Sequence, residues 1–365
     1  MLELLLNASM KSLAVELLLD LVKTYSPTYR EDKAIRVLED YTRRLKYNNI
    51  TIDSTGNLIA EIGSGDKSIA LVGHIDTVRG YIKPLFNGNE IIGRGVVDAK
   101  GPLAAMTIAG SIASNYIDTS TLKIILIASV GEEGSSYGAR SLLKTLKADY
   151  IIVGEPTNIT GIAIGCKGSC RLIVKCNTTG GHTANPELYI SACREIIEVL
   201  ESIEALLSRE YTITPTYVRC GSSINNIIPR NGIMIVNIRI PIGKSIEDLE
   251  EILHKNINTP SCTWMLRDCS MPFKTSPSNT TARAISRALA KLGLKPRYVV
   301  KSGTSDMTIL SKITNNIAEN GPGAPELSHT DNEAMSIDDY IAGIRVYANT
   351  IIELYNMIKL GDKSR

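Results

Sequence analysis

The chain has 365 residues, of which 44% are hydrophobic and 21% are charged, and its formal net charge at pH 7 is +2. This composition is ordinary for a globular protein, and the small net charge gives no indication of nucleic acid or an anionic membrane as a partner. Because 365 residues exceed the usual content of one hydrophobic core, we expect two domains.

The N-terminal run is hydrophobic enough to suggest a signal peptide at first inspection. Charged residues interrupt it at helical spacing, namely Glu3, Lys11, Glu16 and Asp20, and no small-residue cleavage site closes an apolar core. We therefore expect an amphipathic helix of a cytoplasmic protein. Met10 is an alternative translation start, in which case the residues before it are an extension.

Between Asn57 and Gly165, short strand-like runs alternate with helical ones. The strand-like runs include SIALVG, LKIILIASV, YIIVG and TGIAIG, and the helical ones are KGPLAAMTIAGSIASN and GARSLLKTLK. Runs rich in Ile, Val and Leu without strict polar alternation are typical of strands covered on both faces. This segment therefore predicts an α/β domain whose largely parallel sheet is flanked by helices.

The character of the sequence changes after Gly165. Four strand-like runs and two helices, expected from about Glu187 to Leu207 and from about Ser245 to Ile257, follow in the order β-α-β-β-α-β. That order predicts a ferredoxin-like α+β module of about a hundred residues.

The α/β character returns at residue 274 and continues to a last helix. Ser336 followed by Asp339 is a capping signature for the start of that helix. We therefore expect one domain of residues 1–165 and 274–365, into which residues 166–273 are inserted as a second domain.

All seven cysteines fall between Cys166 and Cys269. No two of them form a CxxC pair, and the odd count leaves at least one outside any disulfide. We expect most of them to be small buried hydrophobic residues. Their confinement to one segment supports the interpretation of that segment as a separate unit.

Acidic residues and histidines follow the strand-like runs of the α/β domain. Open α/β sheets bind ligands at the carboxyl ends of their strands, so side chains that follow successive strands meet at one edge. These residues are His74, Asp76, Asp98, Glu132, Glu133 and Glu155. Such a set suits zinc or a related divalent ion, and His329 in ELSHTDNE offers a further ligand.

Taken singly, these residues have simpler explanations. Adjacent carboxylates such as Glu132 and Glu133 usually belong to a solvated loop. A lone histidine is usually structural or exposed, as we expect for His254 on its helix. The metal-site interpretation depends on the fact that several successive strand-like runs are each followed by an acidic residue or a histidine. Solvation alone does not explain this repetition.

Six motifs in order resemble those of the dinuclear-zinc aminoacylase/carboxypeptidase family, whose members include acetylornithine deacetylase and succinyl-diaminopimelate desuccinylase. The motifs are GHIDTV, GRGVVDAKG, VGEEGS, VGEP, GGHTANP and SHTDNE, and they extend over nearly the whole chain. The resemblance implies a zinc-peptidase-like α/β catalytic domain of residues 1–165 and 274–365. It also implies that residues 166–273 form a ferredoxin-like lid through which members commonly dimerise.

The resemblance assigns the metal ligands. It implies that Asp98 bridges two divalent metal ions, that His74 and Glu155 complete one of them, and that Glu133 and His329 complete the other. Two ions bridged in this way lie about 3.5 to 4 Å apart and polarise the scissile carbonyl. Zinc is the expected metal, and cobalt accepts the same ligands.

Two further acids receive catalytic roles from the resemblance. Glu132, which faces away from Glu133 in an extended chain, is expected to take a proton from the attacking water and return it to the leaving amine. Asp76 is expected to fix the imidazole tautomer of His74 through the second ring nitrogen. In the family the peptide after the bridging aspartate is cis, which predicts a cis Asp98–Ala99 bond.

The lid and a later loop supply the expected substrate-binding residues, His182, Asn225, Arg239, Lys167, Gly303 and Thr304. In the family this histidine reaches the oxyanion from the other subunit, and the positions of Asn225 and Arg239 hold the carboxylate and carbonyl of the substrate. Bidentate capture of a carboxylate would also explain an arginine within the apolar run IMIVNIRIP. Without the resemblance, His182 would be a turn histidine and Ser302–Asp306 a simple helix N-cap.

The implied reaction is hydrolysis of an amide with release of an amino acid. Only 22 positions separate Asp76 from Asp98, and DAKGPLA and ENGPGAPELSHT replace the more usual DMKG types. Both features resemble the branch that releases lysine or ornithine from the C-terminal glutamate of a small acidic amino-group carrier protein in lysine and arginine biosynthesis. The alternatives are acetylornithine deacetylase, succinyl-diaminopimelate desuccinylase and a broader carboxypeptidase.

A catalytically inactive binding protein is the alternative from another class. It would have lost Glu132 or a metal ligand, whereas the whole set is present, and a repelling acid cluster without metal would be costly. Charge does not identify a protein partner, because residues 166–273 contain eleven Lys/Arg and eleven Asp/Glu. A local basic patch could still exist.

Overall fold

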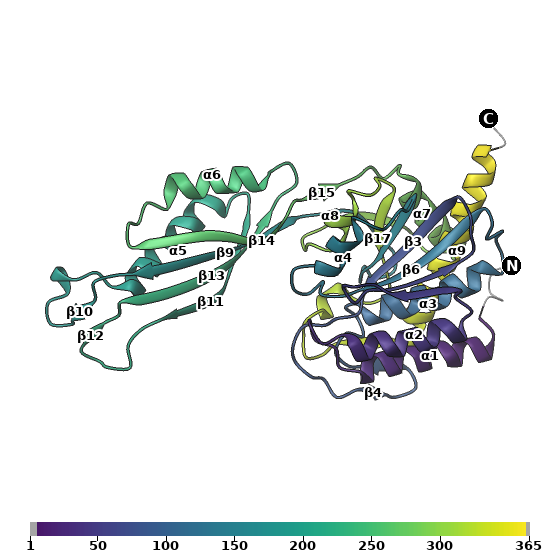
Figure 1. Cartoon of the computed structure of the whole chain (residues 1–365), viewed down its shortest axis with the longest axis horizontal. Helices are drawn as coiled ribbons and strands as arrows, with labels where there is room; N and C mark the ends of the chain where they lie inside the picture. The colour runs from purple at the N-terminus through teal and green to yellow at the C-terminus, as the bar shows by residue number, and fades with distance from the viewer. Residues whose placement is uncertain (1–5, 363–365) are drawn as a thin grey trace. The chain divides into compact units, whose positions relative to one another are not determined.

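The chain divides into two compact units, which Figure 1 shows with their elements labelled. The computed structural model describes residues 6–362. Unit 1 consists of Met1–Gly165, Thr275–Val300 and Ser305–Arg365. Unit 2 consists of Cys166–Lys274, which interrupts unit 1 along the chain, and of Lys301–Thr304.

Unit 1 is built on a mixed sheet whose centre is parallel. Its strands lie in the order β1-β2-β6-β3-β7-β17-β8, with β16 beside β8. The neighbours β6, β3, β7 and β17 are parallel, whereas β1 with β2, β2 with β6, and β17 with β8 are antiparallel. The strands are β1 Asn49–Ile52, β2 Leu58–Ile62, β3 Lys67–His74, β6 Leu122–Ser129, β7 Tyr150–Gly154, β8 Gly161–Cys166, β16 Arg297–Lys301 and β17 Ile317–Asn320.

The buried runs of the sequence explain why these strands are central. In β3 every residue after Lys67 is buried, and in β6 only Lys123 is partly exposed. Strands of this kind are covered on both faces. The predicted α/β unit with a largely parallel sheet is confirmed.

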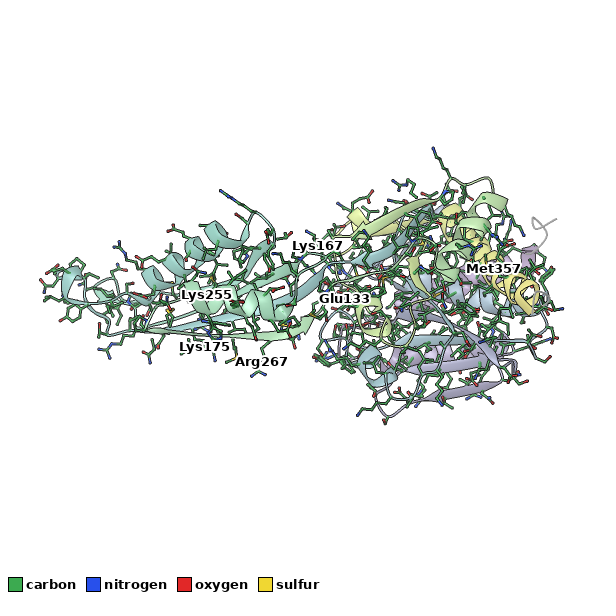
Figure 2. The ribbon with its side chains drawn as sticks, turned by 90° about the horizontal axis from the view of Figure 1, so that it is seen from above. Glu133, Lys167, Lys175, Lys255, Arg267 and Met357 are labelled. Carbon is green, nitrogen blue, oxygen red and sulfur yellow. A yellow bond between two sulfur atoms is a disulfide. The ribbon has the colours of Figure 1, made fainter. Side chains whose placement is uncertain are left out.

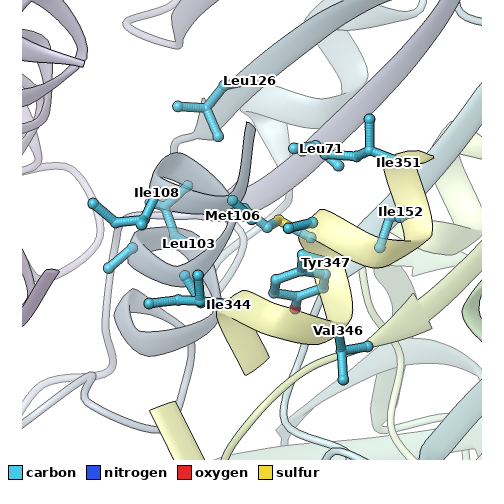
Figure 3. Close-up of a cluster of buried hydrophobic side chains, with 14 of the residues drawn as sticks. Leu71, Leu103, Met106, Ile108, Leu126, Ile152, Ile344, Val346, Tyr347 and Ile351 are labelled. Carbon is cyan, nitrogen blue, oxygen red and sulfur yellow. The ribbon is translucent and has the colours of Figure 1, made fainter. Parts of the chain in front are cut away.

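Helices cover this sheet, and all of them except α4 and α8 contribute buried residues to one hydrophobic core with it. They are α1 Ala8–Lys23, α2 Asp32–Arg44, α3 Lys100–Ser114, α4 Tyr137–Leu142, α7 Thr280–Lys291, α8 Met307–Leu310 and α9 Ile337–Asp362. Figure 3 shows Leu103 and Met106 of α3 beside Tyr347 of α9, with Leu71 of the sheet nearby. All four are fully buried.

The first helix confirms the amphipathic interpretation of the N-terminal run. Leu17, Leu18 and Leu21 are buried, Lys11 is exposed, and the Asn7 side chain caps α1 by accepting a hydrogen bond from the backbone N–H of Met10. The predicted charge at position 3 lies outside the described residues. Among residues 6–362, no helix is both long and apolar enough to cross a membrane.

A small three-stranded sheet joins two distant loops of unit 1. It consists of β4 Leu85–Phe86, β5 Glu90–Ile92 and β18 Ala334–Ser336, with β18 antiparallel to β5. Ser336 accepts a hydrogen bond from the Asp339 N–H at 3.0 Å, which confirms the predicted cap of α9. Because β5 and β18 pair, the loop after β5 and the loop before β18 lie side by side.

Unit 2 has the predicted β-α-β-β-α-β order. Its elements are β9 Gly168–Asn177, α5 Ala192–Leu207, β11 Thr212–Cys220, β13 Asn231–Ile240, α6 Ile246–Asn256 and β14 Cys262–Ser270. The sheet order is β11-β13-β9-β14, all antiparallel, which is the ferredoxin-like arrangement. The short strands β10 Gly181–His182 and β12 Ile227–Ile228 pair with each other, and β15 spans Phe273–Lys274.

The predicted start of the first helix in unit 2 is wrong. A 3-10 turn occupies Pro186–Leu188, and Tyr189 has an extended backbone, so α5 begins at Ala192 rather than near Glu187. The second helix, α6, begins one residue after Ser245, whose side chain and Asp248 form a reciprocal capping box.

The expectation for the cysteines is also wrong. Six of them form the disulfides Cys170–Cys269, Cys176–Cys262 and Cys193–Cys220, all in unit 2, and Cys166 is buried. The pairing of β9 with β14 places Cys176 directly opposite Cys262. Strand register decides this pairing, and residue spacing in the sequence does not show it.

Candidate metal centre

The parallel strands of unit 1 carry their acids and histidines to one edge of the sheet. His74 is the last residue of β3, and the neighbouring strands β6 and β7 end at Ser129 and Gly154. Glu132 and Glu133 follow the first of these strands, and Glu155 follows the second. Because the carboxyl ends of parallel neighbours coincide, these side chains are brought together as predicted.

Asp98 lies between two imidazole–carboxylate pairs. Its Oδ1 is 3.1 Å from His74 Nε2, which is also 3.8 Å from Glu155 Oε1. Its Oδ2 is 3.4 Å from His329 Nε2, which is 2.8 Å from Glu133 Oε1. The structure therefore gathers all five residues predicted as ligands, with one pair on each oxygen of Asp98.

This donor set fits divalent metal ions. His74, Asp98 and Glu133 each offer a ligand atom, and these atoms lie within 4.8 Å of one another. Figure 2 labels Glu133 in unit 1. Imidazole nitrogens together with carboxylate oxygens suit zinc and related ions, and bound cations would offset the mutual repulsion of the acids.

The pKa values within the cluster reflect this repulsion. Burial raises the pKa of Glu133, and the charge of Asp98 adds to the increase, while the hydrogen bond with His329 opposes it. Burial alone would lower the pKa of His74, but its hydrogen bonds with Asp76 and Asp98 raise that pKa well above its ordinary value. The hydrogen bond with Glu133 raises the pKa of His329. Without a bound cation, the negative charge of the cluster therefore favours protonation of both histidines and of Glu133.

Glu132 lies beside the ligand set without joining either pair. Burial raises its pKa well above the ordinary value, the charges of Glu155 and Asp306 add to the increase, and the charge of His74 opposes it. The loop that carries Glu132 turns at Gly131, where φ is 72° and a Cβ would lie 1.9 Å from Tyr137 Cε1. Only glycine fits this position.

Asp76 does more than the sequence predicted. His74 Nδ1 lies 2.9 Å from the backbone oxygen of Asp76 and 3.5 Å from its Oδ1. The carboxylate also accepts hydrogen bonds from the N–H groups of Glu132 and Glu133, both at 3.1 Å, and from Thr28 Oγ1 at 2.8 Å. Asp76 therefore positions the backbone of the loop between β6 and α4 as well as the imidazole. The Asp98–Ala99 peptide is cis, as predicted.

Sequence reasoning missed the residues that join the two ligand-bearing loops. Glu333 is buried and accepts hydrogen bonds from the N–H groups of Gly95, Val97 and Asp98 at 2.9 to 3.1 Å. Arg94 donates to Glu333 at 3.2 Å and to the backbone oxygen of Thr330 at 2.8 Å. The loop of Asp98 and the loop of His329 are thus fixed to each other. The sequence feature that could have identified Glu333 is its place as the last residue of the motif SHTDNE.

Lys100 and Asp306 were also missed. Lys100 is fully buried, donates to the backbone oxygens of Leu21 at 2.9 Å and Thr24 at 2.8 Å, and has a pKa lowered by burial to about 7. Asp306 occupies the N-cap position of the short helix α8, but its side chain accepts a hydrogen bond from Ser129 Oγ at 2.7 Å instead of capping. Among residues 6–362, its buried Oδ1 has no hydrogen-bond partner.

The predicted substrate-binding residues form two groups within unit 2. In the first, Arg239 Nη1 donates to Thr304 Oγ1 at 3.1 Å, and Thr304 Oγ1 donates to the backbone oxygen of Lys167 at 2.7 Å. Lys167 Nζ also donates to Thr212 Oγ1 at 3.1 Å. A Cβ at the neighbouring Gly303 would meet nothing within 4 Å, so space is open beside this group.

The second group lies at the other end of unit 2. His182 is in β10 and opposite Ile227 of β12, so it lies close to Asn225, and both side chains are exposed. β12 precedes Asn231, the first residue of β13, whereas Arg239 is near the last. At about 3.3 Å per residue, the length of β13 separates the two groups by roughly 25 to 30 Å. One copy of unit 2 does not bring His182 and Arg239 together.

His254 stays outside both groups, as expected. Its ring packs against Trp264 with centroids 4.6 Å apart. The contact joins α6 to β14, and His254 therefore has a structural role.

The fold and the cluster together define a class of protein. An α/β sheet with histidines and carboxylates at the ends of its parallel strands, and with one carboxylate between two imidazole–carboxylate pairs, is the arrangement of a metal-dependent hydrolase. The sequence profile described as Peptidase family M20/M25/M40 matches residues 70–353, and the chain belongs to that family. The resemblance drawn from the motifs is thereby confirmed.

Relatives and solved structures agree with this assignment. The chain is 38% identical over 352 residues to a LysW-lysine/LysW-ornithine hydrolase of Saccharolobus solfataricus, covering 95% of this chain and 98% of the relative. A protein of the same name from Saccharolobus islandicus is 36% identical over 349 residues, covering 94% and 97%. The M20 family metallo-carboxypeptidase Sso-CP2 of Sulfolobus solfataricus has a TM-score of 0.81 at 18% identity, covering 94% of this chain and 99% of that one. A Bacillus subtilis dinuclear metal binding peptidase of the same family has a TM-score of 0.71 at 14% identity, covering 95% and 98%.

Proposed function

We propose that this protein is a metal-dependent amide hydrolase that releases lysine and/or ornithine from the C-terminal glutamate of a small acidic amino-group carrier protein. The names of the relatives at 36 to 38% identity support the substrate class. The position of Asp98 between two imidazole–carboxylate pairs is the observation that carries the chemistry. The reaction belongs to lysine and arginine biosynthesis and takes place in the cytoplasm.

Two divalent ions per subunit would be held by five side chains. His74 and Glu155 would hold one ion, Glu133 and His329 the other, and Asp98 both. When bound, the ions supply Lewis acidity and lower the pKa of water. Zinc is the proposed metal, and cobalt would be accepted by the same nitrogen and oxygen donors.

Glu132 is the proposed proton carrier. Its carboxylate would take a proton from the attacking water and deliver it to the leaving amine, which is the α-amino group of the released amino acid. Asp76 would position Glu132 by accepting a hydrogen bond from the Glu132 backbone N–H at 3.1 Å. Adjacent acids thus have different tasks because Glu133 faces His329 while Glu132 remains outside the pairs.

Substrate binding would use both groups in unit 2. Arg239 would hold a substrate carboxylate through its guanidinium, which Thr304 already positions, and Lys167 would contribute a further positive charge. Asn225 and Gly303 would contact the substrate as well. His182 would stabilise the oxyanion formed at the scissile carbonyl.

The separation of the two groups supports a homodimer formed through unit 2. If His182 and Arg239 act on one substrate, a second copy has to supply one of them. β11 is an edge strand, and Tyr217 and Val218 in it are 43% and 50% exposed. The neighbouring α5 exposes Ile197. An exposed, partly apolar edge strand is suited to pair with the same strand of a second copy.

Charge segregation in unit 2 supports an acidic protein as the substrate carrier. The open face of the sheet carries Arg171, Lys175, Arg219, Arg239 and Arg267, and the helices on the other face carry the acids Glu195, Glu198, Glu201, Glu204, Glu247, Asp248, Glu250 and Glu251. Asp268 pairs with Arg171 at 2.7 Å. Lys175 and Arg267 are labelled in Figure 2. Unit 2 therefore has one basic face, although residues 166–273 contain equal numbers of basic and acidic residues.

A side-by-side hydrolysis assay tests the proposal. The metal-loaded enzyme is offered carrier-linked lysine, carrier-linked ornithine, N-acetylornithine and N-succinyl-diaminopimelate at equal concentrations. We expect fast release only from the carrier conjugates. Preference for either free acylated amino acid would overturn the substrate while leaving the metal chemistry, and a protein that binds no divalent ion would overturn both.

A further inference from the structure

Two exposed loops of unit 2 carry the residues proposed to act on the substrate oxyanion and carboxylate. The His182 loop, residues 178–191, connects β9 to α5, and the Asn225 loop, residues 221–230, connects β11 to β13. The loops pair with each other through β10 and β12, and the Thr183 N–H donates to the Asn226 backbone oxygen at 3.2 Å. Because of this pairing, a displacement of one loop displaces the other.

Hydrophobic burial does little to fix this pair of loops. Gly180 and Ile228 are buried, whereas almost all the other residues of the two loops are exposed. Segments with few buried apolar contacts open locally at low free-energy cost. The position of His182 therefore depends on how the chain ends of the loops are held.

Those four ends are held in two different ways. On one side, Asn177 of β9 is paired with Asn231 of β13, and the Thr178 N–H donates to the Arg230 backbone oxygen at 2.8 Å. On the other side, the disulfide Cys193–Cys220 joins the first turn of α5, where the His182 loop ends, to the last residue of β11, where the Asn225 loop begins. Hydrogen bonds also hold this second side, because Cys220 pairs with Gly232 of β13 and the Ala192 N–H donates to the Pro229 backbone oxygen at 3.0 Å. The disulfide adds a covalent bond directly between α5 and β11.

We propose that the Cys193–Cys220 disulfide is a positioning cross-link that holds the His182 and Asn225 loops in the geometry required for hydrolysis. The inference rests on the proposed function, because it assigns the loops a task in that reaction. Reduction by a dithiol would transfer two electrons and two protons to the sulfurs, giving the thiols of Cys193 and Cys220 and oxidising the dithiol to its disulfide. The loops would then lose the covalent link between α5 and β11 and be held at that side by hydrogen bonds alone, and the metal ligands, all in unit 1, would be untouched.

Another disulfide of unit 2 provides a matched control. Cys170 and Cys269 join β9 to β14 near the beginning of β9, at the end of the sheet away from both loops. Removing this bond deletes the same kind of cross-link from the same domain. It does not release either loop.

The test compares Cys193→Ser with Cys220→Ser in one variant against Cys170→Ser with Cys269→Ser in another, each with and without His182→Ala. We expect the first pair to lower kcat/KM by about 10- to 100-fold, as misplacement of a reacting group by about 1 Å does, and to leave metal content unchanged. In the His182→Ala background the same pair should have a smaller effect than in the wild type, since one of the two residues that the cross-link positions is gone. Losses that simply multiply in that background would overturn the inference.

Dithiothreitol offers a second test that needs no variant to fold. With metal content verified after treatment, it should lower the activity of the wild type and of the Cys170/Cys269 variant, but not of the Cys193/Cys220 variant. Hydrogen exchange should show faster exchange at residues 178–191 and 221–230 on reduction. If the wild type hydrolyses no carrier conjugate, the proposed function fails, but hydrogen exchange still tests whether the disulfide holds the loops. Unchanged protection of both loops on reduction would overturn that role.

Discussion

Glu132 and Glu133 are neighbours in sequence with different surroundings, and substitution can separate their roles. Glu132→Gln keeps the shape of the side chain but cannot accept a proton. We expect kcat to fall by about 10²- to 10⁴-fold with metal content unchanged, as for loss of a general base. Glu133→Gln should instead lower metal content, since Glu133 faces His329 at 2.8 Å. Measurement of kcat together with metal per subunit checks both, and a fully active Glu132→Gln enzyme would contradict the assignment.

Asp306 makes stability depend on pH. Burial raises its pKa from 3.8 to about 6 despite the hydrogen bond from Ser129. The folded state therefore holds the proton more tightly than the unfolded chain, so the contribution of Asp306 is most favourable below pH 3.8 and is lost as the pH rises to about 6. At 1.36 kcal/mol per pKa unit the loss is about 3 kcal/mol.

Asp306→Asn, which cannot ionise, isolates this contribution. Urea unfolding of metal-free wild type and variant from pH 4 to pH 7 gives two free energies of unfolding at each pH. The wild-type value minus the variant value should fall by about 2 kcal/mol over that range, mostly below pH 6. A difference that does not change with pH would show that Asp306 is ionised normally in the folded protein.

Three of the ligand residues were predictable because they stand at or shortly after the carboxyl ends of strands. His74, Glu133 and Glu155 lie at the ends of neighbouring parallel strands, so their meeting at one edge needs only the topology. Asp306 was not predictable, because its role depends on a contact with Ser129 across 177 positions. The pattern SGTSD looks like a cap, and only the tertiary structure redirects the carboxylate.

At the scale of elements, the buried Arg94–Glu333 pair connects the loops that carry Asp98 and His329. Glu333→Gln would remove a buried charge that Arg94 and three backbone N–H groups contact. Breaking a buried pair costs about 3 to 5 kcal/mol, and disturbing groups that orient metal ligands costs about 10- to 100-fold in affinity. We expect both effects in unfolding and metal titration.

Asp331→Asn is the matched control. Asp331 also approaches Arg94, at 3.4 Å, but its side chain is 98% exposed whereas that of Glu333 is 1% exposed. Exposed pairs contribute about 0 to 1 kcal/mol. Equal losses in the two variants would mean that burial of the pair is not what fixes the loops.

The basic face of the unit 2 sheet should affect binding rather than chemistry. Lys175→Glu with Arg267→Glu reverses two exposed charges on that face. We expect KM for carrier-linked lysine to rise about tenfold at low ionic strength with kcat unchanged, and the effect to shrink near 1 M salt. Lys255→Glu, on α6 at the other face, is the control. The same rise in KM for the control would contradict docking at the sheet face.

Unit 2 shows which features of an element the sequence can predict. The order of strand-like runs and helices was predicted, and the second helix was placed within one residue of its observed bounds, Ile246–Asn256. The start of α5 was misplaced because Pro186 opens a separate 3-10 turn before the helix. The disulfide Cys176–Cys262 followed from strand register, which alternation does not determine, and Cys193–Cys220 followed from the packing of α5 against β11.

At the scale of the whole molecule, the two units divide the work. The five proposed metal ligands belong to unit 1, and the disulfides belong to unit 2. Unit 2 also has its own hydrophobic core, which includes Leu172, Val236 and Leu249.

This division predicts that the units can be separated. Because the Thr275 N–H donates to the Ile164 backbone oxygen at 2.7 Å, a short glycine linker can replace residues 166–274. The shortened protein should bind divalent metal within about tenfold of the wild-type affinity, since no proposed ligand is removed. Its kcat/KM should fall by at least about 10³-fold, since loss of an oxyanion donor alone costs about 10²- to 10³-fold and Arg239 is lost with it.

The excised residues 166–274 form the complementary protein. Under oxidising conditions they should unfold cooperatively, and dithiothreitol should lower the midpoint of the transition, because the three cross-links restrict the unfolded chain. Metal titration and hydrolysis assays on the shortened protein then decide the division. If the shortened protein retains hydrolysis, unit 2 takes no part in catalysis. If it loses metal binding, the metal centre needs unit 2 to form.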